Sequence, residues 1–122
     1  MDTATAETLA TIERFNDAFN RHDVDAVMAL MTDDVVFENT APPEGQRYVG
    51  QDDVRAFWDS FFASNPGAWF DTEESFVTGD RCTAFWRFTF DKRNPESGSV
   101  RGIDVFRVRD GKVAEKLSYV KG

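Results

Sequence analysis

The chain has 122 residues, a formal net charge of −8 and an aromatic content of 14%, with twelve Phe, three Trp and two Tyr. A chain of this length can bury one substantial hydrophobic core, and its acidic surface repels phosphate groups, so we expect no nucleic acid and no membrane as a partner. The single cysteine, Cys82, and the single histidine, His22, exclude an internal disulfide and a structural zinc site, so we expect no metal.

The spacing of apolar residues predicts three helices in the first half of the chain. The first covers about residues 5–20, where one face carries Leu9, Ile12, Phe15, Ala18 and Phe19. A short second helix follows Asp23, a candidate N-cap, and is expected to end at Asp33 and Asp34. The third begins near Asp52 and stops before Asn65, and its apolar face is formed by Val54, Phe57, Trp58, Phe61 and Phe62.

Alternation of apolar and polar residues predicts strands in the second half of the chain. A brief strand at 35–39 and an extended piece at 47–49 come first, and from Trp69 the period is two, with strands at about 69–78, 81–92, 100–109 and 112–120. Short turns at 79–80 and 110–111 predict hairpins. This order predicts one α+β domain over residues 1–122, in which a curved antiparallel sheet wraps three N-terminal helices and encloses a cavity.

Three segments of the chain carry a family resemblance: FNRHDVDA at 19–26, YVGQDDVRAF at 48–57 and GIDVFRVRDGKVAEK at 102–116. In this order they resemble the nuclear transport factor two-like superfamily, and most closely its SnoaL-like branch. The resemblance implies a cone-shaped fold around an apolar pocket. This fold hosts ketosteroid isomerases, polyketide cyclases, epoxide hydrolases, dehydratases and silent binding or dimerisation modules, so the pocket residues must decide the activity.

The resemblance to ketosteroid isomerases implies that three positions carry the chemistry. Asn39 falls on the position of the carboxylate base, Phe15 on that of a tyrosine donor, and Asp104 on that of a protonated aspartate. An amide cannot abstract a proton at neutral pH, and a phenyl ring cannot donate a hydrogen bond. Steroid isomerisation by that mechanism is therefore disfavoured.

The resemblance to epoxide hydrolases of this fold is also incomplete. Arg87 matches their arginine, but Thr89 and Ser118 stand where the two carboxylates belong. This mechanism is therefore disfavoured as well. Polyketide cyclases of the SnoaL type are thought to need little more than one acid/base carboxylate, so that class stays open.

Strand alternation predicts an inner face that is apolar except for Asn39 and Asp104. Asp104 lies between Ile103 and Val105, which indicates a pocket acid or base, with a solvent-facing or subunit-interface carboxylate as the alternative. Asn39 is expected to orient a ligand carbonyl or to stabilise a turn.

The role of Asp104 depends on Lys116. In an apolar cavity, desolvation favours a neutral Asp104 that can donate a hydrogen bond, whereas pairing with Lys116 would keep it a carboxylate. We favour a surface position for Lys116, paired with Glu115. His22 and Cys82 are expected to be a helix-end residue and a half-buried apolar residue.

The sequence therefore predicts a cofactor-free protein that binds a small hydrophobic, cyclic or polyketide-like molecule. If it is an enzyme, it transfers a proton through Asp104, and the expected ligand-binding residues are Asn39, Phe15, Trp58, Trp86, Phe88, Phe106 and Ser118. The alternative is a catalytically silent ligand-binding or dimerisation module.

Two further expectations concern assembly and location. Phe85, Val105 and interspersed Arg on the outer sheet face predict a homodimer. The first seven residues lack a basic region followed by an apolar run, and no stretch approaches the ~20 apolar residues of a membrane span, so we expect a cytoplasmic protein.

Overall fold

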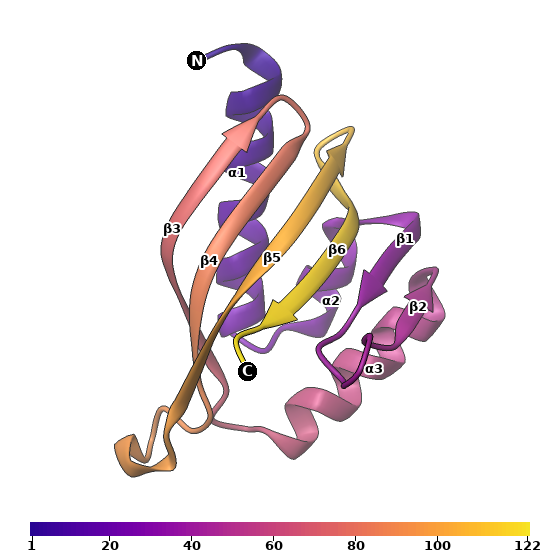
Figure 1. Cartoon of the computed structure of the whole chain (residues 1–122). Helices are drawn as coiled ribbons and strands as arrows, with labels where there is room; N and C mark the ends of the chain where they lie inside the picture. The colour runs from indigo at the N-terminus through magenta and orange to yellow at the C-terminus, as the bar shows by residue number, and fades with distance from the viewer.

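A curved, unclosed six-stranded sheet wraps around the helices in the computed structural model, which describes residues 1–122 (Figure 1). The strand order is β2-β1-β6-β5-β4-β3. In chain order, the elements are α1 (Thr3–Asn20), α2 (Val24–Ala29), β1 (Met31–Glu38), β2 (Arg47–Val49), α3 (Gln51–Ser64), β3 (Trp69–Thr78), β4 (Arg81–Thr89), the 3-10 turn η1 (Pro95–Ser97), β5 (Ser99–Arg109) and β6 (Lys112–Val120). The α+β fold expected from the sequence is confirmed.

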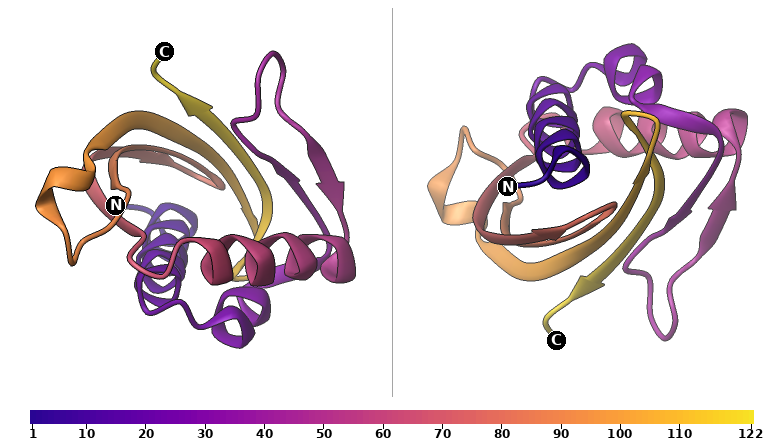
Figure 2. Two further views of the ribbon diagram at one scale, coloured as in Figure 1. Left: turned by 90° about the horizontal axis from the view of Figure 1, so that it is seen from below. Right: turned by 90° about the horizontal axis from the view of Figure 1, so that it is seen from above.

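The sheet is mixed, which corrects the expectation of an antiparallel sheet throughout. The ladder from β3 to β6 is antiparallel, but β1 pairs with β6 in parallel. The parallel pairing arises because the last strand returns to the middle of the sheet, between β1 and β5. End-on views show the sheet curving around α1, with α3 crossing beside it (Figure 2).

The second helix is shorter than the sequence pattern predicts. It ends at Ala29, and Asp33 and Asp34 belong to β1 as exposed residues. Two contacts explain the early end: the Leu30 carbonyl accepts a hydrogen bond from the Val113 N–H on β6, and Gln51 Nε2 donates to carbonyls that include that of Met31. Pairing with β6 therefore replaces the last predicted helical turn.

Helix α1 is attached to β3 and its turn at both ends. Near its N-terminus, Thr8 Oγ1 donates to the Gly79 carbonyl at 2.6 Å, and the Gly79 N–H donates to Thr5 Oγ1 at 2.9 Å. At its C-terminus, the Asn20 side chain makes two hydrogen bonds with the backbone of Phe70, at 2.8 and 2.9 Å. These bonds fix α1 against the concave face of the sheet.

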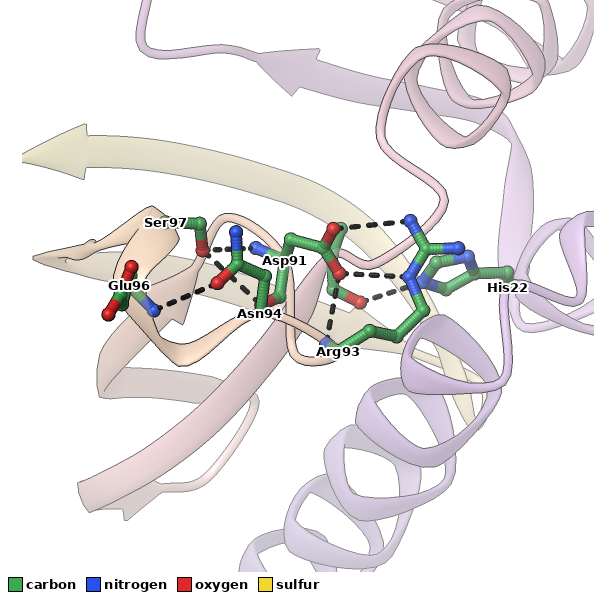
Figure 3. A network of polar contacts seen from close by, with 7 residues as sticks. His22, Asp91, Arg93, Asn94, Glu96 and Ser97 are labelled. Carbon is green, nitrogen blue, oxygen red and sulfur yellow. Dashed lines mark hydrogen bonds and ion pairs between the residues drawn. The ribbon is translucent and has the colours of Figure 1, made fainter.

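The connection between β4 and β5 is held by its own polar contacts (Figure 3). Asp91 Oδ1 accepts hydrogen bonds from the backbone N–H and Nε of Arg93, and Asn94 Oδ1 accepts from the Glu96 N–H. Strand β4 consequently ends at Thr89, before the predicted residue 92. Nearby, His22 Nε2 lies 2.7 Å from the Ala68 carbonyl.

The core is an aromatic cluster between α1, α3 and the sheet. Phe19 is at its centre, with ring centroids of Trp58 and Phe62 at 4.9 Å and that of Phe70 at 5.0 Å. Edge-to-face contacts of this kind add stabilisation beyond the burial of apolar area.

None of the helices is both long and apolar enough to cross a lipid bilayer.

Candidate functional site

A cavity of about 110 Å³ lies between α3, the end of β1 and the inner faces of β4, β5 and β6. Its aromatic walls are formed by Phe37, Phe57, Trp58, Phe61, Phe70, Trp86 and Phe88. Its volume approaches that of an apolar cavity of about 150 Å³ that binds benzene, so it suits a molecule with one ring.

A second, smaller cavity of about 20 Å³ lies beside the first, on the side of α1. Both cavities are lined by Phe70, Trp86, Asp104 and Lys116. Phe15 lines the smaller cavity and not the larger one. A space of this size is sufficient for about one water molecule. The Asp104–Lys116 pair therefore adjoins an apolar cavity on one side and a water-sized space on the other.

The polar end of the larger cavity is formed by Asp104, Lys116 and Ser118. Asp104 and Ser118 are cross-strand partners on β5 and β6, and Lys116 lies two residues before Ser118 on the same face. Ser118 Oγ donates to Asp104 Oδ1 at 2.6 Å, and Lys116 Nζ lies 2.9 Å from Ser118 Oγ and 3.4 Å from Asp104 Oδ1. Both bonds to Asp104 end on Oδ1, so Oδ2 is the carboxyl oxygen with no hydrogen bond from the protein.

Lys116 is buried, with 6% of the residue exposed, which contradicts the expected surface pair with Glu115. Alternation along β6 turns Glu115 toward the outer face, where it faces Arg107, and turns Lys116 inward. Burial lowers the pKa of the Lys116 ammonium below its usual value, while the Asp104 carboxylate acts in the opposite direction. The ammonium also lies 4.9 Å from the centroid of the Phe37 ring, within the range of a cation–π contact.

Two buried indole N–H groups in this region have no hydrogen-bond partner in the protein. They belong to Trp58 on α3 and Trp86 on β4, which both line the larger cavity. An unpaired buried donor costs about 1–3 kcal/mol. Both nitrogens are closed off from the cavity space, so a ligand oxygen would reach them only after a side chain moves. The polar groups offered to a ligand are therefore those of Asn39, Asp104, Lys116 and Ser118 among the apolar walls.

Asn39 lies at the rim of the larger cavity and also stabilises a turn. Its Oδ1 accepts hydrogen bonds from the N–H groups of Ala41 and Gln46, at 3.0 and 2.7 Å. Its side-chain NH₂ makes no hydrogen bond with the protein and is the group available to a ligand. Asn39 is thus a turn residue whose amide donor remains available.

The structure brings most of the expected site residues together. The larger cavity is lined by Asn39, Trp58, Trp86, Phe88, Asp104 and Ser118. Phe106 lines neither cavity, because its ring is fully buried and packs edge-on against Phe15 at 5.8 Å. Phe106 is therefore a core residue in this structure, and its place in the ligand-binding set stays a prediction.

Sequence reasoning considered a Lys116–Asp104 pair but favoured a surface position for Lys116. The same alternation that turns Ser118 toward the cavity also turns Lys116 inward, so the signal was present in the strand register. It also missed Phe37 and Phe70, whose rings complete the wall.

The remaining candidates lie outside the larger cavity. Arg87 Nη1 donates to Ser99 Oγ at 3.0 Å on the other face of β4. His22 stacks on Phe62 at 4.5 Å, which agrees with a structural role.

Cys82 is 1% exposed rather than half-buried. Burial, with a smaller contribution from the Asp104 charge, raises the pKa of its thiol to about 11. No group of three or more His, Cys, Asp or Glu side chains could hold a metal ion.

Comparison with known proteins places this site in a family context. The family model of the SnoaL-like domain matches residues 12–116, which include both Asp104 and Lys116. The chain is 41% identical to a nuclear transport factor two-like protein of unknown function from Mesorhizobium loti, with a TM-score of 0.84 over 100% of this chain and 97% of that chain. The chain matches no curated protein.

Two more distant structures share the fold. A candidate ketosteroid isomerase from Kribbella flavida is 20% identical, with a TM-score of 0.81 over 97% of this chain and 80% of that chain. A candidate polyketide cyclase from Sinorhizobium meliloti is 23% identical, with a TM-score of 0.75 over 89% of this chain and 93% of that chain. At such identities the likeness establishes the fold and leaves the chemistry to the residues of the site.

Proposed function

We propose that this chain, which belongs to the SnoaL-like domain family, binds a small hydrophobic ring compound that carries a carbonyl oxygen and transfers a proton on it without a cofactor. The observation that carries this proposal is the aromatic cavity of about 110 Å³ with the buried Asp104, Lys116 and Ser118 at one end. Such a combination of apolar walls and a few convergent polar groups is typical of small-molecule sites.

Asp104 Oδ2 is the proposed acid/base atom. It has no hydrogen bond from the protein, whereas Oδ1 is held by Ser118 and Lys116. As a carboxylate it would remove a proton from the carbon next to the ligand carbonyl and return it to the same or another carbon. The Asn39 side-chain NH₂ and the Lys116 ammonium are the cavity-lining donors that would stabilise the negative oxygen that forms.

The size of the cavity favours a ligand with one ring over a four-ring steroid. Asn39 and Phe15, which stand where ketosteroid isomerases carry a base and a phenol, favour the same choice. The candidate polyketide cyclase among the similar structures supports cyclic or polyketide-like ligands as a class to test.

Exchange of the protons next to the carbonyl of cyclohexanone in D₂O, followed by NMR, tests the proposal. We expect the native protein to accelerate exchange and Asp104→Asn to lower the rate by about 10²-fold or more, because a positioned acid or base contributes that much. The matched control is Asp59→Asn, which makes the same chemical change at an exposed position on α3. Equal exchange rates in the native protein and Asp104→Asn would contradict the role of Asp104.

The second candidate is a ligand-binding module without catalysis. It is favoured because these polar atoms already have hydrogen-bond partners in the protein. Asn39 Oδ1 accepts hydrogen bonds within a turn, and Asp104 Oδ1 accepts from both Ser118 and Lys116. Cyclohexanone that changes the tryptophan fluorescence in a saturable way, with no acceleration of exchange in D₂O, would select this candidate.

We also propose that two copies of the chain associate through the outer face of the sheet. Phe76 on β3 and Tyr119 on β6 are 58% and 54% exposed there, and the half-buried Phe85 on β4 packs against Phe76 at 5.8 Å. Apolar side chains gathered on one face are typical of an association surface. A stable dimer would bury about 1,000 Å² or more in total.

A further inference from the structure

We propose that the Lys116 amine is a nucleophile that forms an imine with an aldehyde or ketone bound in the aromatic cavity. The inference rests on the proposed binding of a carbonyl compound, but it assigns a covalent step to a residue that the proton-transfer proposal leaves as a partner of Asp104. Lysine amines attack carbonyl carbons when they are neutral, close to the carbonyl and shielded from water.

The position of Lys116 meets the geometric requirement. Its side chain is 8% exposed, and the residue lines the cavity with Nζ 4.9 Å from the Phe37 ring centroid and 5.3 Å from that of Trp58. Both rings are cavity walls. A ring compound that stacks against them therefore brings its carbonyl carbon close to Nζ.

The surroundings of Lys116 also favour the neutral amine. Burial disfavours the ammonium form and outweighs the Asp104 carboxylate, which favours that form. The same carboxyl group lies 3.4 Å away and can accept the proton. Ser118 Oγ, at 2.9 Å from Nζ, connects the two groups through a second hydrogen bond of 2.6 Å to Asp104. The proton can therefore pass from the Lys116 nitrogen to Asp104, directly or through Ser118, without being released to solvent.

The reaction balances within the site. A proton passes from the Lys116 ammonium to the Asp104 carboxylate, the nitrogen lone pair bonds to the carbonyl carbon, and the π electrons of the carbonyl move to oxygen. One proton shifts from nitrogen to that oxygen and gives a carbinolamine. Asp104 returns its proton to the hydroxyl group, the carbon–oxygen bond breaks, and water leaves. The products are a protonated imine on Lys116, an Asp104 carboxylate and one water molecule.

The other lysines provide an internal comparison. Lys92, Lys112 and Lys121 are exposed, and Lys92 Nζ lies 3.3 Å from the centroid of the Trp69 ring, outside the aromatic cavity. Exposed amines are strongly hydrated and mostly protonated at neutral pH. They should therefore react with a carbonyl compound far more slowly than Lys116.

Reductive trapping tests the proposal in the native protein. The folded chain is incubated with cyclohexanone and sodium cyanoborohydride near neutral pH, which reduces an imine to a stable secondary amine, and the adduct is located by peptide mass spectrometry. We expect the adduct on Lys116 at about tenfold or more the level on any exposed lysine, because a ketone bound in the cavity meets Nζ at a far higher effective concentration than a ketone in solution meets an exposed amine. Lys112→Met is the control variant and should trap as the native protein does.

Parallel measurements separate this proposal from the proposed function. Lys116→Met should lose the adduct, and circular dichroism checks that this variant folds. If it does not fold, the location of the adduct in the native protein by peptide mass spectrometry still tests the proposal. Saturable quenching of tryptophan fluorescence by cyclohexanone without an adduct on Lys116 would overturn the imine proposal and leave ligand binding intact. Adducts only on the exposed lysines and the N-terminal amine would overturn it as well. Absence of both quenching and adduct would overturn both proposals.

Discussion

Trp86 lies directly over Gly102, its cross-strand partner on β5, and occupies the space that a side chain at position 102 would need. A Cβ placed on Gly102 would lie 2.6 Å from two atoms of the indole ring and would collide with the Tyr119 carbonyl oxygen. Because Trp86 lines both cavities, this glycine determines where one wall of the site stands.

Gly102→Ala should therefore displace Trp86 and weaken both the fold and ligand binding. We expect the free energy of unfolding to fall by about 1–3 kcal/mol, the usual cost of overpacking a core. Urea denaturation measures the stability, and fluorescence titration with cyclohexanone measures the affinity. Gly122→Ala is the control, because a Cβ there meets no atom within 4 Å. A variant as stable as the native protein would show that the strands separate at low cost.

The buried Asp104–Lys116 pair should be strongly coupled in stability. Asp104→Asn alone leaves the Lys116 ammonium without its carboxylate, and we expect it to destabilise the fold by up to about 3 kcal/mol. Lys116→Met combined with Asp104→Asn should cost less than the sum of the two single changes, since neither variant side chain carries a charge.

A double-mutant cycle by chemical denaturation measures this coupling. The exposed pair of Arg55 and Asp25, with Asp25 at 89% side-chain exposure, is the control and should show almost no coupling. Additive effects at Asp104 and Lys116 would mean that the two groups do not interact.

The lowered pKa of Lys116 predicts how stability depends on pH. The folded state loses the proton at a lower pH than the unfolded chain, whose value is near 10.5, so between the two values the unfolded state binds more protons. The cost of burying the ammonium is fully present below the folded pKa and disappears as the pH rises toward 10.5.

The native protein should therefore gain stability relative to Lys116→Met as the pH rises from the folded-state pKa of Lys116 toward 10.5. Urea denaturation of both proteins at a series of pH values gives the difference. Subtracting the variant removes titrations that both chains share, including that of Cys82. A difference that falls with pH would mean that Asp104 stabilises the ammonium more than burial penalises it.

The outer face of the sheet should determine the oligomeric state. Phe76→Glu places a charge within the proposed interface, so we expect it to convert a dimer into the 13.8 kDa monomer, with the fold retained because Phe76 is 58% exposed. Val49→Glu, at a 54% exposed position on β2, is the matched control. Light scattering measures both variants; a native protein that is already monomeric at micromolar concentration would refute the dimer.

Local patterns in the sequence predicted most of the fold. The three-residue and four-residue spacing of apolar side chains located α1 and α3, and the change to a period of two located β3 to β6. The start of α1 was missed by two residues because Asp2 caps it, accepting the Thr5 N–H at 2.7 Å. Asp33 and Asp34 suggested a helix end, but they lie exposed in β1, where its pairing with β6 is irregular between Met31 and Val36.

The misses share one physical origin, which is contact between distant segments. The parallel pairing of β1 with β6 joins residues about eighty positions apart, and no local pattern specifies it. Lys116 was assigned to the surface because an isolated lysine is rarely buried; its burial depends on Asp104, twelve residues away on the neighbouring strand. Phe106 is on the expected face, but the Phe15 ring covers it.

The attachment of α1 to β3 at both ends has a consequence for ligand traffic. The hydrogen bonds at Gly79 and Phe70 make this side of the molecule a fixed wall, so opening there would break four hydrogen bonds at once. Thr40, two residues after the end of β1, and Val120, the last residue of β6, also line the larger cavity and are exposed. If the proposed ligand binds, we expect it to enter and leave past these two residues and not past α1.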